Sequence, residues 1–199
     1  MKKNLKYFEN ELARLNKEFA DYKEKHIGMP EIGKAIELSG EEWLILDKTE
    51  KGYFAILNGF NGEAIKFDLK LNDWLSSDLR YDLNTRFLKE ITNEFGEDAV
   101  IEFDRDLLSM DGQTEYGHCK DKISLLTMDE YRKYRKFIPN MDKWWWLLTP
   151  WSTPANNCSM IVTAVSPYGI IGYYDCDGNC SVRPVCIFSF SIFEPRSDD

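Results

Sequence analysis

The side chains best suited to acid–base or nucleophilic chemistry are two histidines and a thiol beside one of them. His118 directly precedes Cys119, whereas His26 lies in a highly charged N-terminal segment. A thiol nucleophile needs a base within hydrogen-bond reach, and adjacent residues seldom have that geometry. The chain also lacks the Gly-x-Ser-x-Gly, phosphate-loop, dinucleotide-binding and His-Glu-x-x-His motifs. We therefore predict no catalytic residues, no cofactor and no enzyme activity.

A short run of oxygen-bearing side chains near the C-terminus raises the question of a metal site. Asp175, Asp177 and Asn179 alternate around Gly178, as oxygen ligands of calcium do in some loops. No glutamate follows at the distance that such loops require, so an ordinary polar turn is favoured. The number of cysteines is odd and none form a Cys-x-x-Cys pair, so we predict neither a zinc site nor a disulfide framework. Four of them lie in the last quarter: Cys158, Cys176, Cys180 and Cys186.

The last quarter also combines aromatic and small polar residues in a way that is typical of binding surfaces. Tyrosine and tryptophan give rigid contact area, while asparagine, aspartate and threonine give adaptable hydrogen bonds. The residues that we predict to contact a ligand are Trp151, Thr153, Asn156, Asn157, Tyr168, Tyr173, Tyr174, Asp175, Asp177 and Asn179.

Short strands joined by polar loops are predicted to position these residues. Residues 144–148, 160–165, 169–174 and 182–190 are apolar runs separated by Ser, Thr, Asn, Asp, Pro and Gly. Side chains of a strand alternate between its faces, so Trp145 and Trp146 are expected on opposite faces and mostly in the core.

The middle of the chain is predicted to mix strands and helices. Residues 43–46, 53–57 and 64–67 read as an antiparallel meander, and 100–103 and 123–126 as further strands. Ser77 is placed to cap a helix with an apolar face that Gly96 ends. Thr127 and Glu130 form a capping box before a shorter helix over 128–137.

The N-terminal segment carries a narrow apolar stripe at coiled-coil spacing. We predict a coiled-coil oligomerisation helix over residues 1–28, followed by one domain over 32–199. Packing of the same stripe on its own domain is the alternative, because three heptads are marginal alone. The stripe consists of Leu5, Phe8, Leu12, Leu15, Phe19 and Tyr22.

Composition excludes several classes of partner and location. The net charge of −9 leaves no basic stripe, which argues against nucleic acid as a partner. No apolar run is long enough for a membrane span, and the charged N-terminus lacks the apolar core of a secretory signal. We expect a cytoplasmic or virion-associated protein.

Four sequence blocks, in order, resemble an uncharacterised domain family of bacteria and their phages. The family has a Trp-Trp-Leu-Arg-Ser-Pro … Gly-Val-Arg-Pro signature, and this chain departs from it at Leu148 and Ser181, which replace arginine and glycine. The resemblance implies an α+β, C-type-lectin-like fold, akin to the formylglycine-generating-enzyme scaffold, that displays irregular loops without catalysis. The blocks lie at residues 36–47, 74–87, 121–131 and from 145–150 to 182–185.

Lectin-like proteins of this kind include the variable proteins of diversity-generating retroelements. Their randomised codons scatter tyrosine, asparagine, aspartate and cysteine over exposed positions, and residues 159–180 have that composition, with Cys158, Cys176 and Cys180 as apparent examples. An ordinary loop rich in asparagine and cysteine is the alternative. Arg183 is expected to anchor the fold through hydrogen bonds.

The resulting hypothesis is a non-catalytic, ligand- or receptor-binding display protein. Its partner would be a protein or a cell-surface ligand, and a homo-oligomer would add avidity. The alternative is a phage-encoded inhibitor that binds a host defence protein.

Overall fold

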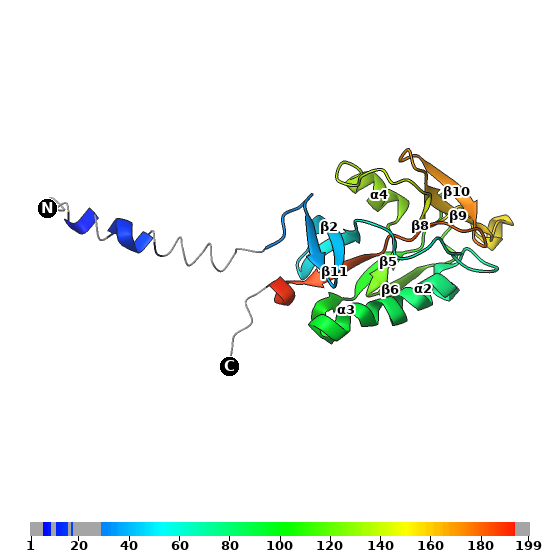
Figure 1. Cartoon of the computed structure of the whole chain (residues 1–199). Coiled ribbons are helices and arrows are strands. Elements are labelled where there is room, and N and C mark those ends of the chain that lie inside the picture. Colours follow the sequence, from blue (N-terminus) through cyan, green and yellow to red (C-terminus); the bar gives the residue numbers. More distant parts are fainter. Residues whose placement is uncertain (1–5, 9–10, 16, 18–28, 194–199) are drawn as a thin grey trace. The chain divides into compact units, whose positions relative to one another are not determined.

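The computed structural model describes residues 6–8, 11–15, 17 and 29–193, and the chain divides into two units (Figure 1). The first unit comprises Met1–Met29 and Phe193–Asp199. Its described residues 6–8, 11–15 and 17 are helical, and Phe8, Leu12 and Leu15 are exposed. Self-association through this stripe stays a prediction. The other residues assigned to the stripe, Leu5, Phe19 and Tyr22, lie outside the described residues.

The second unit, Pro30–Ile192, is built around a six-stranded antiparallel sheet. Its strand order is β1-β2-β3-β11-β4, and β7 also pairs with β11. The strands are β1 (Ala35–Leu38), β2 (Glu41–Lys48), β3 (Gly52–Leu57), β4 (Val100–Ile101), β7 (Ile123–Ser124) and β11 (Val185–Ser189).

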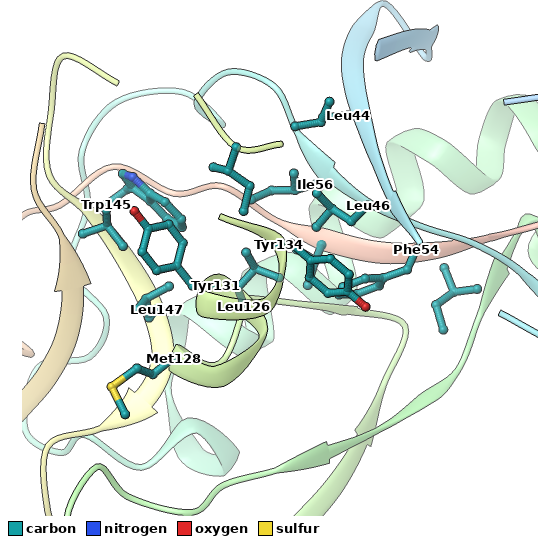
Figure 2. Close-up of a cluster of buried hydrophobic side chains, with 14 residues drawn as sticks. Leu44, Leu46, Phe54, Ile56, Leu126, Met128, Tyr131, Tyr134, Trp145 and Leu147 are labelled. Carbon is teal, nitrogen blue, oxygen red and sulfur yellow. The ribbon is translucent and has the colours of Figure 1, made fainter. Parts of the chain in front are cut away.

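This sheet is covered on both faces, which explains the continuous apolar runs of β2 and β3. Trp43 packs on one face against Phe87 and Phe188, at ring-centroid distances of 6.1 and 4.9 Å. On the other face, Leu44 and its neighbours pack against helix α4 (Met128–Tyr134). Figure 2 shows this second cluster, in which Tyr134 of α4 lies beside Phe54 of β3 and Tyr131 lies beside Trp145. Strands buried on both sides lose the alternation of apolar and polar residues.

The longest helical segment lies on the opposite side of the unit from α4 (Figure 1). It runs as α2 (Asp78–Asp82), a π-helical turn (Leu83–Phe87) and α3 (Leu88–Phe95). The predicted cap is confirmed, because Ser77 Oγ accepts a hydrogen bond from Arg80 N–H. Gly96 ends the segment with a φ of 92°, a conformation that favours glycine.

A smaller, three-stranded antiparallel sheet has the order β10-β9-β8, and β5 and β6 form a separate pair. Trp145 and Trp146 are both buried on opposite faces of β8, as predicted: Trp145 contacts Tyr131 and Trp146 contacts Phe67. These strands are β8 (Trp145–Pro150), β9 (Ile161–Val165), β10 (Ile171–Asp175), β5 (Phe103–Asp106) and β6 (His118–Asp121). Short 3-10 turns occupy η1 (Trp74–Ser76), η3 (Glu97–Ala99), η4 (Pro154–Asn156) and η5 (Phe190–Phe193).

The mixed α+β class is therefore confirmed, with corrections to individual elements. The strand predicted over 64–67 is wrong, because only Ile65 forms a bridge, with Cys180. The helix predicted over 128–137 ends at Tyr134, although its capping box is present. In the part of the chain that the structure describes, no helix combines the length and apolarity needed to cross a membrane.

A buried carboxylate connects the long helical segment to strand β6. Asp121 accepts hydrogen bonds from Trp74 Nε1 (2.7 Å) and Arg80 Nε (2.8 Å), and its side chain is 1% exposed. Asn84 Oδ1 accepts from Ile123 N–H (3.0 Å), while its Nδ2 donates to Ile123 O (2.7 Å). The polar residues of the block at 74–87 thus join the helix to the strands.

A second buried ion pair joins β5 to α4. Arg105, only 2% exposed, donates from both terminal nitrogens to the carboxylate of Glu130 at 2.7 Å. The same carboxylate accepts from Thr127 N–H (2.8 Å), which completes the capping box. Glu130 therefore serves the helix end and the buried arginine together.

Candidate functional site

The predicted ligand residues come from a loop and from one edge strand of the smaller sheet. Trp151, Asn156 and Asn157 lie in the loop between β8 and β9, and the rest, Thr153 apart, follow β9. Among the aromatic residues of the predicted set, Tyr168 and Tyr173 are the most exposed, at 81% and 56%. The other exposed residues of the predicted set are Asn156, Asn157, Tyr174, Asp175, Asp177 and Asn179.

Three assignments to the exposed surface are wrong. Thr153 is fully buried, and its carbonyl accepts hydrogen bonds from the N–H groups of Asn156 and Cys158 as the 3-10 turn forms. Cys176 and Cys180 are also buried, because residues 65–68 cover them. The N–H of Ile65 donates to Cys180 O, and Cys180 N–H donates back to Ile65 O. These cysteines are small core residues and not variable surface positions.

The loop and the edge strand meet through an aromatic pair. The rings of Trp151 and Tyr173 lie 4.7 Å apart between centroids, with their planes inclined at 58°. Trp151 is partly exposed, and its backbone N–H donates to Ile161 O of β9. Tyr173 stands opposite Thr163 of β9, whose hydroxyl donates to Thr149 O. The backbone that carries each ring is therefore held against strand β9.

Tyr174 belongs to the opposite face of the same sheet. Its ring lies 5.4 Å from that of Trp144 and 6.3 Å from that of Trp146. The absence of a side chain at Gly172 makes room for Trp144, because a Cβ there would lie 2.9 Å from the indole. The predicted residues thus form two aromatic groups, one on each face of β10, and not one continuous surface.

Polar residues far away in the sequence hold the loop after β8. Asp111 Oδ2 accepts from Ser152 Oγ (2.7 Å) and Asn156 Nδ2 (3.0 Å), and Glu115 Oε2 accepts from Ala155 N–H (2.9 Å). On the other side, Asn72 Nδ2 donates to Ser152 O and Ile161 O, at 2.9 and 2.8 Å. Such bracing fixes a loop that sequence alone presents as irregular.

The hydroxyl groups of Ser109 and Ser152 donate to Asp111 and lower the pKa of its carboxyl to about 2. A lowered pKa stabilises the fold above the ordinary value of 3.8, and this contribution disappears as the pH falls from about 4 to about 2. We expect Asp111→Asn to have a lower melting temperature than wild type at pH 7. This difference in melting temperature should shrink as the pH falls from about 4 to about 2. Thermal melts at pH 7, 4 and 2 would measure it; a gap that does not change with pH would contradict the role of the charge.

The segment that raised the question of calcium forms a turn. Gly178 N–H donates to Asp175 O at 2.8 Å, as in an ordinary polar turn. Among the residues that the structure describes, no three His, Cys, Asp or Glu side chains are grouped to hold a metal ion.

We compared the chain with protein-family models, with curated proteins and with solved structures, and none of these comparisons gave a match. The lectin-like fold, which the resemblance to the bacterial and phage family implies, is therefore a proposal.

Two clefts of about 440 Å³ each lie away from the predicted residues. The first runs between β5 and the start of α4, with the Arg105–Glu130 pair, Asp104 and Met110 in its wall. The second lies beside α2 and is lined by Arg80, Tyr81, Asn84, Lys120 and Asp121 among others. The sequence does not indicate these clefts, because each joins segments that lie well apart along the chain.

Cys119, Cys176 and Cys180 lack the features of a nucleophile. Burial, together with the nearby Asp121 carboxylate, raises the pKa of Cys119 to about 12, and His118 lies exposed beside Asp106. Burial likewise raises the pKa of Cys176 to about 11 and that of Cys180 to about 12. Reactive thiols have the opposite shift.

We therefore expect only Cys158, which is partly exposed, to react rapidly with a disulfide reagent at pH 8. With a pKa of 11 to 12, only about one in 10³ to 10⁴ of the Cys119, Cys176 and Cys180 thiols is ionised at that pH, and complete burial raises the pKa of Cys186 well above its ordinary value. Titration should give one fast thiol in the native protein and all five after denaturation. Equal labelling of Cys119 and Cys158 would contradict this description.

The predicted anchor Arg183 is fully buried and does not reach the surface. Its Nε donates to Leu57 O (3.1 Å), and its guanidinium lies 5.0 Å from the Trp145 ring. Burial lowers the pKa of Arg183 to about 10, so it is still charged at neutral pH. Within the described residues, the contact with tryptophan thus accompanies one hydrogen bond from the Arg183 side chain.

Proposed function

We propose that this chain is a non-catalytic binding protein with a C-type-lectin-like domain. The ligand would contact the loop after β8 and strand β10, and the N-terminal helices of several copies would associate to add avidity. The ligand would be a protein or a cell-surface molecule, and the chain would bind it in the cytoplasm or on a virion.

The observation that supports this proposal best is the Trp151–Tyr173 pair on a braced loop. An aromatic pair of which Tyr173 is exposed and Trp151 partly exposed gives a ligand a rigid apolar contact, and the exposed Asn157 and Asp175 offer hydrogen-bonding groups. Tyr168 and Ile170, at 81% and 64% exposure, extend the apolar area at the turn before β10. Concentrations of exposed apolar residues of this kind mark interaction sites.

The test is a screen of the full-length chain against a glycan array and a phage-displayed library of random 12-residue peptides. We expect at least one ligand class to bind wild type and to lose binding to Trp151→Ala. Tyr81→Ala is the control, because Tyr81 is an exposed aromatic residue on α2, outside the set of predicted ligand residues. Absence of any ligand in both libraries, or undiminished binding by Trp151→Ala, would contradict the proposal.

Retroelement diversification remains a hypothesis for the exposed positions alone. Among the predicted ligand residues of this segment, those positions are Tyr168, Tyr173, Tyr174, Asp175, Asp177 and Asn179. Sequencing the DNA beside the gene would test it: an imperfect repeat of the 3′ end should differ at these codons. A repeat that differs equally at the buried Cys176 and Cys180 codons, or no repeat, would contradict it.

A further inference from the structure

Strand β10 is the outer strand of its sheet. The strand order β10-β9-β8 places β9 on one side of it, and no other described strand pairs with it. Figure 1 shows β10 at the periphery of the unit, beside β9. The outer edge of such a strand presents backbone N–H and C=O groups without a strand partner.

The hydrogen-bond pattern determines which groups these are. Ser166 N–H donates to Ile170 O (2.9 Å) at one end of the ladder, and Cys176 N–H donates to Met160 O (2.6 Å) at the other. Hydrogen-bonded and non-bonded pairs alternate along an antiparallel ladder. The even-numbered residues of β10 therefore direct their backbone groups toward β9.

The odd-numbered residues direct theirs outward. Ile171 and Tyr173 each present one N–H and one C=O to the open edge, and Asp175 presents its N–H. The Asp175 carbonyl already accepts from Gly178 N–H, so the usable edge ends there. These groups have the alternate spacing with which an added strand would pair.

Aromatic side chains stand on both faces of this edge. Tyr173 with Trp151 lies on one face, and Tyr174 with Trp144 lies on the other. An added strand projects its side chains alternately to the two faces, so each face would meet an aromatic group. Recognition by strand addition combines main-chain pairing with such alternate side-chain contacts.

The charge at one end of the edge favours a basic partner. Asp175 and Asp177 are exposed, and no ion pair to either occurs in the described part of the chain. The carboxylates of Asp68 and Asp177 both raise the pKa of the Cys176 thiol, so negative charges lie close together at this end of β10. A second copy of β10, with the sequence Ile-Gly-Tyr-Tyr-Asp, would supply no basic side chain.

We propose that the outer edge of β10 binds an extended polypeptide segment of a partner protein, with a lysine or arginine beside Asp175. The segment would add a fourth strand to the β8–β10 sheet. This inference rests on the proposed function and narrows its ligand to a polypeptide.

A pair of substitutions at one position separates main-chain pairing from side-chain contact. Tyr173→Ala removes the ring and keeps the N–H, whereas Tyr173→Pro removes both. Proline is tolerated on edge strands where the N–H faces outward, so the β9 ladder should remain. We expect peptides selected from the random 12-residue library on the full-length chain to bind Tyr173→Pro at least about tenfold more weakly than Tyr173→Ala. A thermal melt of each variant would show that both are folded.

Amide hydrogen exchange measured by NMR on the free wild-type chain gives an independent result. The amides of Ile171 and Tyr173 should exchange rapidly and those of Gly172 and Tyr174 slowly, with the fast pair becoming protected when a selected peptide binds. Equal protection in the free chain, equal peptide binding by the two Tyr173 variants, or no peptide enrichment would overturn strand addition. If strand addition is overturned but a glycan binds and Trp151→Ala abolishes that binding, the proposed binding function is still supported. If no glycan binds either, both the proposed function and strand addition are contradicted.

Discussion

Replacing Asp121 with asparagine is expected to lower the free energy of unfolding by about 3 kcal/mol, the lower end of the range for breaking a buried ion pair. The Asp121 carboxylate is 1% exposed and accepts from both Trp74 and Arg80. The neutral amide would leave the Arg80 guanidinium without its counter-ion. Because the Arg80 side chain is 28% exposed, water would compensate part of that loss.

Asp82→Asn provides the matched control for this substitution. Asp82 pairs with Arg86 through the same kind of contact, at 2.8 Å, but on the exposed side of the helical segment. Exposed pairs contribute about 0 to 1 kcal/mol, so this variant should stay close to wild type. Urea denaturation followed by tryptophan fluorescence would measure both. A loss below 1 kcal/mol for Asp121→Asn would show that the carboxylate does not join the helix to the sheet.

The second large effect is expected on binding. Trp151→Ala should weaken the affinity for a ligand found by screening by about 30-fold or more, which corresponds to about 2 kcal/mol. The substitution removes the indole and also the support that holds the Tyr173 ring, 4.7 Å away. Since Trp151 is partly exposed, the free energy of unfolding should change much less than for a buried tryptophan.

Calorimetric titration of wild type, Trp151→Ala and Tyr81→Ala would measure this difference. Tyr81 lines the cleft beside α2, so the control also reports on that alternative site. A large loss for Tyr81→Ala with none for Trp151→Ala would place the ligand in the cleft.

Local signals were sufficient to predict the elements with strong caps or continuous apolar runs. Ser77, Thr127 and Glu130 marked true helix starts, and the runs of β2, β3, β8 and β9 are real strands. These features depend on neighbours within a few residues. The opposite burial of Trp145 and Trp146 followed from strand alternation.

Features that depend on distant segments could not be predicted in this way. The buried positions of the pair β5–β6 are occupied by the charged residues Arg105 and Asp121, so the strands show no alternation of apolar and polar residues. Cys176 and Cys180 lie in a polar stretch of sequence that indicates exposure, yet residues 65–68 bury them. The residues that brace the loop after β8, Asn72, Asp111 and Glu115, lie 40 to 89 residues from their partners. No local pattern assigns such partners.

Hydrogen–deuterium exchange of the full-length chain, free and with a ligand from the screen, tests the location of the binding surface most directly. We predict slower exchange confined to residues 151–157 and 168–179, the loop after β8 and the region of β10. Protection restricted to residues 102–112 with 127–132, or to 75–88 with 118–122, would place the ligand in one of the two clefts and contradict the account.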